Sequence, residues 1–380
     1  MKRIKLFGLL LLTAVAATVN AQEEQFVKAG SMDALFAKAK KENKMVFVDS
    51  YFVGCHPCKQ MDDEVFVLPE VKKLLSNNFV STKIDFMTED LGKQLQVKYA
   101  VTGFPTFLLL NSDGQLVARF SGYKEADKFQ DLLKESLAKF KKGEAMKGFS
   151  SSLNVNYPAF YPAMFTDRKP INADEIAAYV KGKNLLEEAN AIPFLMTSKM
   201  SPEMADFLLQ NYTKLEALYG KDMVWGRRLQ VITARMKAAM PTRDDAKFES
   251  FLAGVKPLFS TADWPYAKLD IAEEYYYRQH KDAKAFYKYA AANYNDDDNK
   301  VRYMAMYLKS PADDAEGNKL FANWMQLVVT ENSGTEVLST AARIMKGQNE
   351  PEKAKKYAAW GVKKAKLINK DSKYFESFLN

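Results

Sequence analysis

The chain contains two cysteines, Cys55 and Cys58, separated by two residues. Such a pair can bind a metal, form a structural cross-link, or cycle between dithiol and disulfide. A structural zinc site normally needs four ligands, and the only histidines are His56, between the cysteines, and the distant His280. Closing so short a loop removes little chain entropy, so a purely structural disulfide would add little stability. The spacing therefore favours reversible dithiol/disulfide chemistry.

The segments on either side of the cysteines predict a strand before them and a helix after them. Residues 44–49 form a short apolar, β-prone run that predicts a buried strand ending in Asp49. Pro57 stands where a first-turn proline is tolerated, and residues 58–66 are typical of a helix. Cys55 would then lie at a helix N-terminus, where free amides and the helix dipole stabilise a thiolate. The thiolate is the attacking species in disulfide exchange.

The segments that follow predict the rest of a compact α/β domain. They are a strand at 79–85, a helix at 89–99, a turn, proline and strand at 101–110, a hairpin turn at 111–114, a strand at 115–120 and a closing amphipathic helix at 124–141. The resulting order β, α, β, α, β, β, α extends over about residues 32–142.

This order of elements resembles the thioredoxin fold, and three motifs strengthen the resemblance. They are Cys55-His56-Pro57-Cys58, Asp49 six residues before the first cysteine, and Gly103-Phe104-Pro105-Thr106, which is similar to the cis-proline loop of that family. The stretch from Gly54 to Val71 is most similar to the branch that includes the periplasmic thiol:disulfide interchange proteins. The resemblance implies an α/β thioredoxin fold for residues 32–142.

The resemblance also implies roles for the site residues. Cys55 would be the exposed nucleophile, and Cys58 the shielded thiol that resolves the mixed disulfide. Asp49 would exchange protons with Cys58, because burial raises a carboxyl pKa toward neutrality. Pro105, in cis, would face the disulfide, and the backbone near Phe104 would pair with a substrate chain. The alternatives are a strand-end acid bonded to nearby amides and an ordinary trans turn proline.

Three features depart from the usual thioredoxin pattern. Gly54 stands where thioredoxins usually carry tryptophan, and His56-Pro57 replaces Gly-Pro. No buried lysine is expected on the strand at 79–85, because Ser81 occupies about that position. A protonated His56 would stabilise the reduced form and raise the reduction potential. We therefore expect a potential between about −270 mV and about −120 mV.

The remaining two-thirds of the chain predict an all-α C-terminal domain of helical hairpins. Residues 143–172 mix glycine, proline and aromatic residues, which indicates an irregular connection with packed aromatic side chains; a peptide-binding ledge is the alternative. Helix starts then alternate with short breaks over residues 173–380. Five positions within residues 269–285 recur within residues 338–354, at about twice the 34-residue tetratricopeptide period. We expect a tetratricopeptide-like array, with a nonrepetitive bundle as the alternative.

The N-terminus is typical of a secretory signal peptide over residues 1–21. Three basic residues precede an apolar stretch, and small residues stand at the expected cleavage site after Ala21. The stretch is short for a membrane span, which needs about 20 apolar residues; an uncleaved anchor is the alternative. We therefore expect export to the periplasm of a Gram-negative bacterium, without stable membrane insertion after cleavage.

The formal net charge is +8, but most basic residues alternate with acidic ones or lie at helical spacing. This pattern favours solvated helix faces over a nucleic-acid site. We predict an exported protein-disulfide oxidoreductase that acts on protein or peptide thiols and disulfides. We predict no metal and no cofactor beyond the redox-active Cys55–Cys58 pair.

The direction of electron flow has three alternatives, namely reductase, oxidase and isomerase. Similarity to the interchange proteins favours a reductase that receives electrons from a membrane donor. A scaffolding protein, with both domains serving only as docking modules, is the alternative from another functional class.

Overall fold

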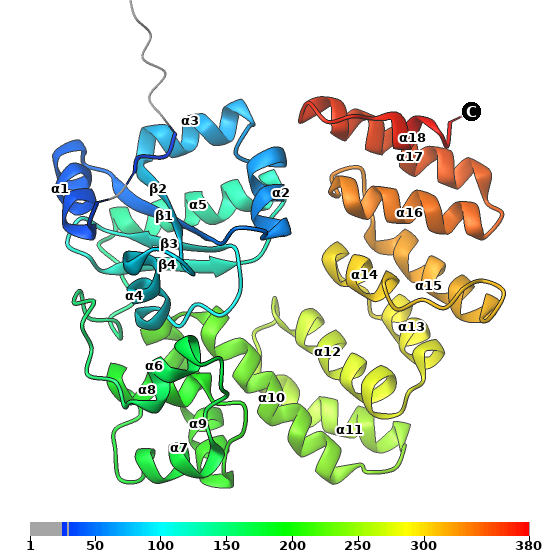
Figure 1. The fold of residues 1–380 in the computed structure, drawn as a ribbon. Coiled ribbons are helices and arrows are strands. Elements are labelled where there is room, and N and C mark those ends of the chain that lie inside the picture. Colours follow the sequence, from blue (N-terminus) through cyan, green and yellow to red (C-terminus); the bar gives the residue numbers. More distant parts are fainter. Residues whose placement is uncertain (1–24, 29, 380) are drawn as a thin grey trace, which may run out of the picture.

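The computed structural model of the protein describes residues 25–28 and 30–379. The signal peptide predicted for residues 1–21 lies outside the described residues. An α/β part comes first, and the helices that follow it form an arm whose last members return to its side (Figure 1). Among the helices of the described ranges, none combines the length and the apolar character that crossing a membrane requires.

A four-stranded mixed sheet in the order β2-β1-β3-β4 forms the centre of the α/β part. The strands are β1 (Met45–Tyr51), β2 (Phe79–Asp85), β3 (Thr106–Leu110) and β4 (Leu116–Ser121). β1 and β2 are parallel, whereas β3 is antiparallel to both β1 and β4. The predicted hairpin turn is confirmed, and within it the Gly114 amide donates to the Asn111 carbonyl.

Five helices cover the two faces of this sheet. They are α1 (Met32–Glu42), α2 (His56–Glu64), α3 (Pro69–Asn78), α4 (Asp90–Lys98) and α5 (Ala126–Lys141). Because alternate side chains of a strand point to opposite faces, Val46 and Val48 of β1 pack with α1 and α4. Phe47 packs on the other face with α2, α3 and α5. β1 is therefore covered on both sides, which holds the end of the strand and the start of α2 in place.

Helices α1 and α3 were not predicted from the sequence. The side chain of Ser31 caps α1 by accepting a hydrogen bond from the Ala34 amide at 3.2 Å. Pro69 begins α3 only a few residues after α2 ends at Glu64.

Helices make up most of the structure after residue 172, as predicted, and α6 (Phe160–Thr166) is a further helix within the segment 143–172, which was predicted to be irregular. The α-helices are α6 (Phe160–Thr166), α7 (Ala173–Val180), α8 (Glu188–Met196), α9 (Pro202–Tyr219), α10 (Lys221–Ala239), α11 (Asp245–Val255), α12 (Trp264–Ala272), α13 (Ala283–Ala292), α14 (Asp298–Ala305), α15 (Ala315–Val328), α16 (Thr335–Gly347), α17 (Pro351–Leu367) and α18 (Lys373–Glu376). A 3-10 helix, η1 (Lys256–Leu258), follows α11, and a π-helix, η2 (Glu273–Gln279), continues α12.

The first helices of the arm share a core with the α/β part. Phe149 and Tyr161, from the connection predicted to carry packed aromatic residues, are buried in the cluster that contains the side chains of α1 and α4. The Tyr161 hydroxyl donates to the Val97 carbonyl at 2.6 Å. Buried Lys98 pairs with Glu188 of α8. These contacts attach helices α6 to α10 firmly to one face of the sheet.

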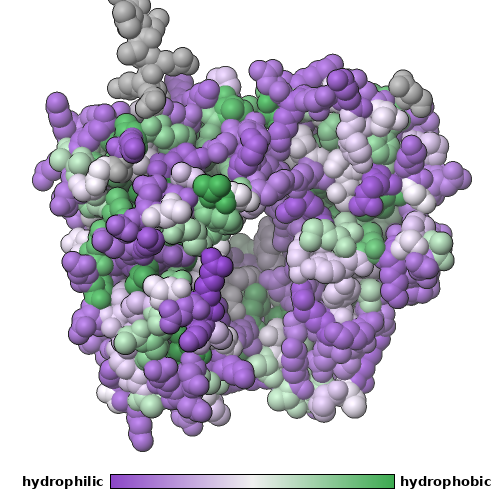
Figure 2. Space-filling model, viewed as in Figure 1, coloured by the Kyte–Doolittle hydropathy of each residue, from purple (hydrophilic) through white to green (hydrophobic). Residues whose placement is uncertain are grey.

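The last helices of the arm make a second, separate contact with the α/β part. Ile368, at the end of α17, is 3% exposed and belongs to the cluster formed by α2, α3 and α5. The intervening helices connect this contact with the first one (Figure 1). The arm is therefore held at both ends. The surface between the α/β part and the later helices of the arm is hollowed (Figure 2).

The positions of the proposed repeat, five within residues 269–285 and five within residues 338–354, lie on corresponding parts of two helical hairpins. The earlier set lies on α12, η2 and the start of α13, and the later set on α16, its C-terminal end and the start of α17. Leu269 and Leu338, which correspond in the two sets, are both fully buried. A tetratricopeptide-like repeat stays a prediction.

Candidate active site

Cys55 and Cys58 lie at the N-terminal end of α2 and are joined by a disulfide. Cys55 is the N-cap of the helix, and its sulfur accepts a hydrogen bond from the Cys58 amide at 3.2 Å. Pro57 lies in the first turn. The predicted placement of the pair at a helix N-terminus is thus confirmed. In the dithiol form, the free amides of this turn stabilise negative charge on the Cys55 sulfur.

The surface around the disulfide differs from what the resemblance implied. Cys55 is only 6% exposed in this oxidised structure, and Cys58 is 4% exposed. The exposed groups beside the pair are Val53, at 82%, and the His56 side chain, at 75%. An apolar and a titratable side chain therefore flank a disulfide that is itself largely shielded.

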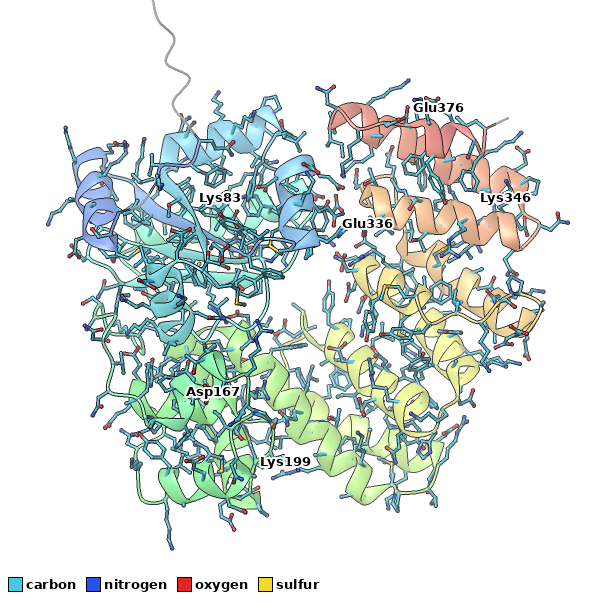
Figure 3. All side chains as sticks on the ribbon, viewed as in Figure 1. Lys83, Asp167, Lys199, Glu336, Lys346 and Glu376 are labelled. Carbon is cyan, nitrogen blue, oxygen red and sulfur yellow. A yellow bond between two sulfur atoms is a disulfide. The ribbon has the colours of Figure 1, made fainter. Side chains whose placement is uncertain are left out.

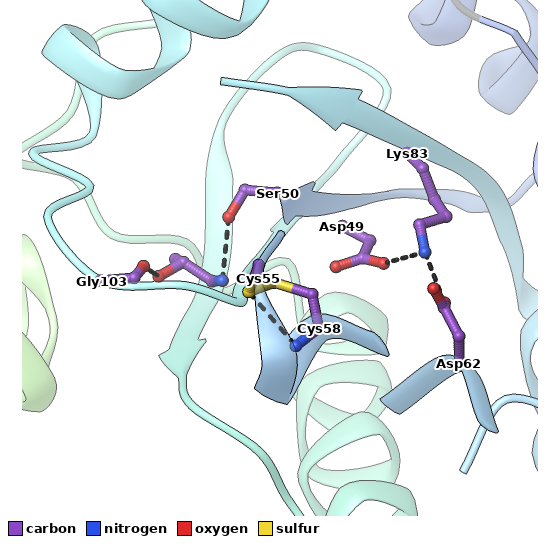
Figure 4. The surroundings of a disulfide bond; sticks show 8 residues. Asp49, Ser50, Cys55, Cys58, Asp62, Lys83 and Gly103 are labelled. Carbon is purple, nitrogen blue, oxygen red and sulfur yellow. Dashed lines mark hydrogen bonds and ion pairs between the residues drawn. A yellow bond between two sulfur atoms is a disulfide. The ribbon is translucent and has the colours of Figure 1, made fainter. Parts of the chain in front are cut away.

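Asp49, the predicted acid at the end of the preceding strand, is 1% exposed. One of its oxygens, Oδ2, lies 3.4 Å from the Lys83 ammonium, which also pairs with Asp62. The other oxygen has no hydrogen-bond partner among the described residues and points toward the disulfide (Figure 4). Burial raises the pKa of Asp49 to about 7, although the positive charge of Lys83 opposes this shift. Asp49 can therefore gain or lose a proton near neutral pH.

The next strand carries a lysine beside Asp49 that was not expected there: Lys83, whose side chain is partly buried at 22% exposed. The parallel register of β1 and β2 places Lys83 opposite Asp49, whereas Ser81 lies opposite Phe47. The lysine was looked for at Ser81, and Lys83 lies two residues later in β2. Both residues lie on the same face of the sheet, because residues two apart in a strand share a face. Counting from the predicted strand starts, residues 44 and 79, would place Ile84 opposite Asp49, so the observed register was needed to identify Lys83.

The loop that precedes β3 lies beside the disulfide (Figure 4). The peptide bond between Phe104 and Pro105 is cis, as the resemblance implied. The Thr106 amide donates to the Ser50 hydroxyl at 2.8 Å, and the Thr106 hydroxyl donates to the Gly103 carbonyl at 2.7 Å. These bonds tie the loop to the end of β1, next to Asp49.

The Phe104 side chain forms part of an aromatic group at this loop. Its ring packs edge-to-face against Phe52 at 5.4 Å and against Phe86 at 6.0 Å. Phe52 is adjacent to the exposed Val53. An apolar surface therefore lies next to the cysteines, and it suits contact with an apolar side chain of a substrate.

A residue from the far end of the chain also reaches the active site. Oε1 of Glu336, in the first turn of α16, lies 3.4 Å from Nε2 of His56. Figure 3 shows Glu336 at the edge of the arm that faces α2. Sequence reasoning missed this residue, because no local pattern links two positions that are 280 residues apart. Within the described ranges, no cluster of three or more potential metal ligands was found.

The comparison with protein families identifies one domain in this chain. Residues 32–137 match the family described as "Thioredoxin-like domain". The chain is similar to the protein disulfide-isomerase of Ricinus communis, with 28% identity over 127 residues, which are 33% of this chain and 25% of that protein. It is also similar to the thiol:disulfide interchange protein DsbD of Colwellia psychrerythraea, with 32% identity over 124 residues, or 31% of this chain and 20% of that protein. The chain thus spans a quarter or less of the length of these two relatives.

Two solved structures resemble the same part of the chain. A thioredoxin from Thermus thermophilus has 28% identity and a TM-score of 0.27, and the match covers 29% of this chain and 85% of that one. The oxidised C-terminal domain of DsbD from Neisseria meningitidis has 24% identity and a TM-score of 0.25, and covers 28% of this chain and 91% of that one.

Residues 32–137 are therefore a thioredoxin-like domain, homologous to domains of DsbD and of protein disulfide-isomerases. This domain carries a Cys-X-X-Cys disulfide at the start of a helix, and the described chain after it consists mainly of helices. The domain assignment and the disulfide together identify the two sulfurs as the candidate redox-active group of this domain.

Proposed function

We propose that the protein is an exported thiol:disulfide oxidoreductase that reduces or exchanges disulfides of periplasmic proteins. One observation carries the proposal: the Cys55–Cys58 disulfide lies at a helix N-terminus beside Asp49, a buried acid with a pKa of about 7. The helix end favours an attacking thiolate, and the acid provides a proton acceptor near neutral pH. A domain that only docked partners would need neither feature.

The proposed reaction begins with the dithiol form. The Cys55 thiolate attacks one sulfur of the client disulfide, which forms a mixed disulfide and releases the other client sulfur as a thiolate. Cys58 loses its proton to Asp49 and attacks the Cys55 sulfur, which breaks the mixed disulfide and releases the second client sulfur. Two electrons have then passed to the client, and the Cys55–Cys58 disulfide remains. Backbone at Phe104 and Pro105 would hold the client chain beside the sulfurs.

Three further parts of the proposal concern the setting of this reaction. The predicted signal peptide supports export to the periplasm. The similarity to DsbD supports a reductant that regains two electrons from a membrane donor. The arm borders the hollow between the two halves of the molecule, and this concave arrangement supports a role in binding clients near Cys55.

The test is the equilibrium reduction potential of the Cys55–Cys58 pair in glutathione buffers at pH 7. We expect a value between about −270 mV, that of thioredoxin, and about −120 mV, that of a strong oxidase. A value near the lower limit supports the reductant, and a value well above about −180 mV supports an oxidase or isomerase. A pair that does not cycle contradicts the enzymatic proposal.

A Cys55→Ser variant separates catalysis from docking. The oxidoreductase is supported if the variant no longer reduces the disulfide of a model peptide and if cells that carry it behave like cells without the protein. If phenotype and client binding survive the substitution unchanged, the protein works as a scaffold and the proposal is wrong.

A further inference from the structure

The end of the arm is attached to the active-site helix through a buried carboxylate. Glu64, in the last turn of α2, is 2% exposed. It accepts hydrogen bonds from the Tyr123 hydroxyl at 2.9 Å, from the Thr335 hydroxyl at 3.1 Å and from the Lys370 ammonium at 2.5 Å. Thr335 begins α16, and Lys370 follows α17. A buried carboxylate requires such partners, so the position of the arm on α2 is well specified.

Neighbouring contacts fix the same end of α16. The Lys364 ammonium lies 3.0 Å from the carboxylate of Glu125, which is 6% exposed. Gly334, the N-cap of α16, has no side chain, and Glu125 occupies the space that a Cβ atom would take. The backbone at the start of α16 therefore lies directly against the thioredoxin-like domain.

This attachment places Glu336 beside the cysteine motif. Each oxygen of its carboxylate faces a different group: Oε1 lies 3.4 Å from Nε2 of His56, and Oε2 accepts a hydrogen bond from Nη1 of Arg302 at 2.8 Å. Arg302 lies on α14, so two helices of the arm hold the carboxylate in position. His56 immediately follows Cys55 in the chain.

We infer that Glu336 is a positioning residue of the active site, which acts through His56 to stabilise the Cys55 thiolate. The inference rests on the proposed function and adds that the helical arm contributes to the redox chemistry. A carboxylate oxygen 3.4 Å from an imidazole nitrogen stabilises positive charge on that ring, and positive charge next to a cysteine favours the thiolate. A stabilised thiolate makes the dithiol form more stable and raises the reduction potential.

The other charged groups around His56 do not reverse the expected effect of Glu336, which is to raise the reduction potential. On its own helix, Lys59 is already paired with Asp63 at 3.0 Å, and Glu64 is paired with Lys370. On the arm, Arg302 offsets the negative charge of Glu336. Direct repulsion between Glu336 and the Cys55 thiolate is therefore weakened, whereas the attraction between Glu336 and His56 acts over 3.4 Å.

The test is a double-mutant cycle with the reduction potential as its readout. In the full-length protein at pH 7, Glu336→Gln should lower the equilibrium constant for reduction by glutathione about threefold, which is about 14 mV at 29.6 mV per tenfold. It should also slow alkylation of Cys55 at pH 6. In a His56→Gln background, Glu336→Gln should change neither quantity, because its route to the sulfur is gone. Glu331→Gln, a control at an exposed acid paired with Lys363 on the arm, should leave both unchanged.

The outcomes separate this inference from the proposed function. Equal shifts with and without His56 would show a general disturbance of the arm, and no shift in either background would show that Glu336 has no influence; both overturn the inference. In each of these cases the pair still cycles, so the oxidoreductase proposal stands. A pair that fails to cycle in the unaltered protein would instead overturn the proposed function.

Discussion

Replacing Asp49 by asparagine should make the protein more stable at alkaline pH while slowing its reaction. The carboxyl lies in the middle of the β1 register, opposite Lys83 on β2 and Phe107 on β3, and is 1% exposed. Burial raises its pKa from the ordinary value of 3.8 to about 7. The folded protein thus retains a proton that the unfolded chain has already lost over this pH range. Asparagine has a similar shape and never carries the charge.

The size of the effect follows from the linkage between proton binding and folding. Between pH 3.8 and about 7 the folded state binds more protons than the unfolded state, so the free energy of unfolding falls as pH rises. The loss is about 1.4 kcal/mol for each pH unit in this window, or about 4 kcal/mol in total once pH exceeds 7. Asp49→Asn removes this loss. The difference in stability between variant and native protein should therefore grow by about 3 kcal/mol from pH 5 to pH 8.

Hydrogen exchange of the backbone amides of β1 and β3 measures this difference in the oxidised protein. All four tryptophans lie beyond residue 220, so their fluorescence does not report on the thioredoxin-like sheet. Exchange rates at pH 5 and pH 8, divided by the intrinsic rates, give the opening free energies. Asp62→Asn is the matched control, because Asp62 also pairs with Lys83 but its side chain is 43% exposed. The control should show less than a third of the effect.

Equal pH dependence of exchange in Asp49→Asn and the native protein would refute this reasoning. Such a result would mean that Asp49 titrates at its ordinary value and is no proton acceptor near neutral pH. The same variant should slow resolution of the mixed disulfide at pH 7, because Cys58 loses its nearby proton acceptor. Rapid quenching with acid followed by mass spectrometry measures the lifetime of that intermediate.

Two further predictions concern the attachment of the arm. Lys98→Met should lower the free energy of unfolding by about 3–5 kcal/mol, because it leaves the Glu188 carboxylate buried without its cation. In urea denaturation, the double variant Lys98→Met/Glu188→Leu should recover most of this loss. A double variant no more stable than the single one would contradict the explanation. Glu64→Gln should speed hydrogen exchange at the start of α16 and the end of α17 about tenfold or more, since bonds to a charged group contribute about 1.5–3 kcal/mol. The control variant Glu331→Gln should leave this exchange unchanged. Unchanged exchange in both variants would show that Glu64 does not hold the arm.

The thioredoxin-like fold and the cysteine site could be predicted because their signals are local. An apolar run ending in Asp49, a first-turn Pro57 and a Gly103-to-Thr106 loop each lie within a few residues of the structure they specify. The positions of β1, α2 and the cis peptide bond agree with those signals. Local propensity and turn chemistry act over such distances.

The partners of the site could not be predicted because they depend on tertiary structure. Lys83 reaches Asp49 through the parallel pairing of β1 and β2, which are joined by two helices. Glu336 reaches His56 only because the arm is attached at both ends, through Lys98 at one end and Glu64 at the other. Neither of these two contacts follows from the spacing of residues in the sequence. Such pairs follow from packing rather than from propensity.

In the proposed reaction the two cysteines need opposite surroundings, which the start of α2 provides for Cys55 and Asp49 of β1 provides for Cys58. Cys55 must be a thiolate before the client arrives, so the free amides and His56 at the start of the helix favour negative charge there. Cys58 must keep its proton until the mixed disulfide forms, and then lose it quickly. A buried acid with a pKa near 7 meets this need, because it is partly deprotonated at neutral pH and yet adds no full charge beside the sulfur. In the proposed reaction the strand and the arm therefore act on different steps, so substitutions at Asp49 should change the lifetime of the mixed disulfide, whereas substitutions at Glu336 should change the reduction potential.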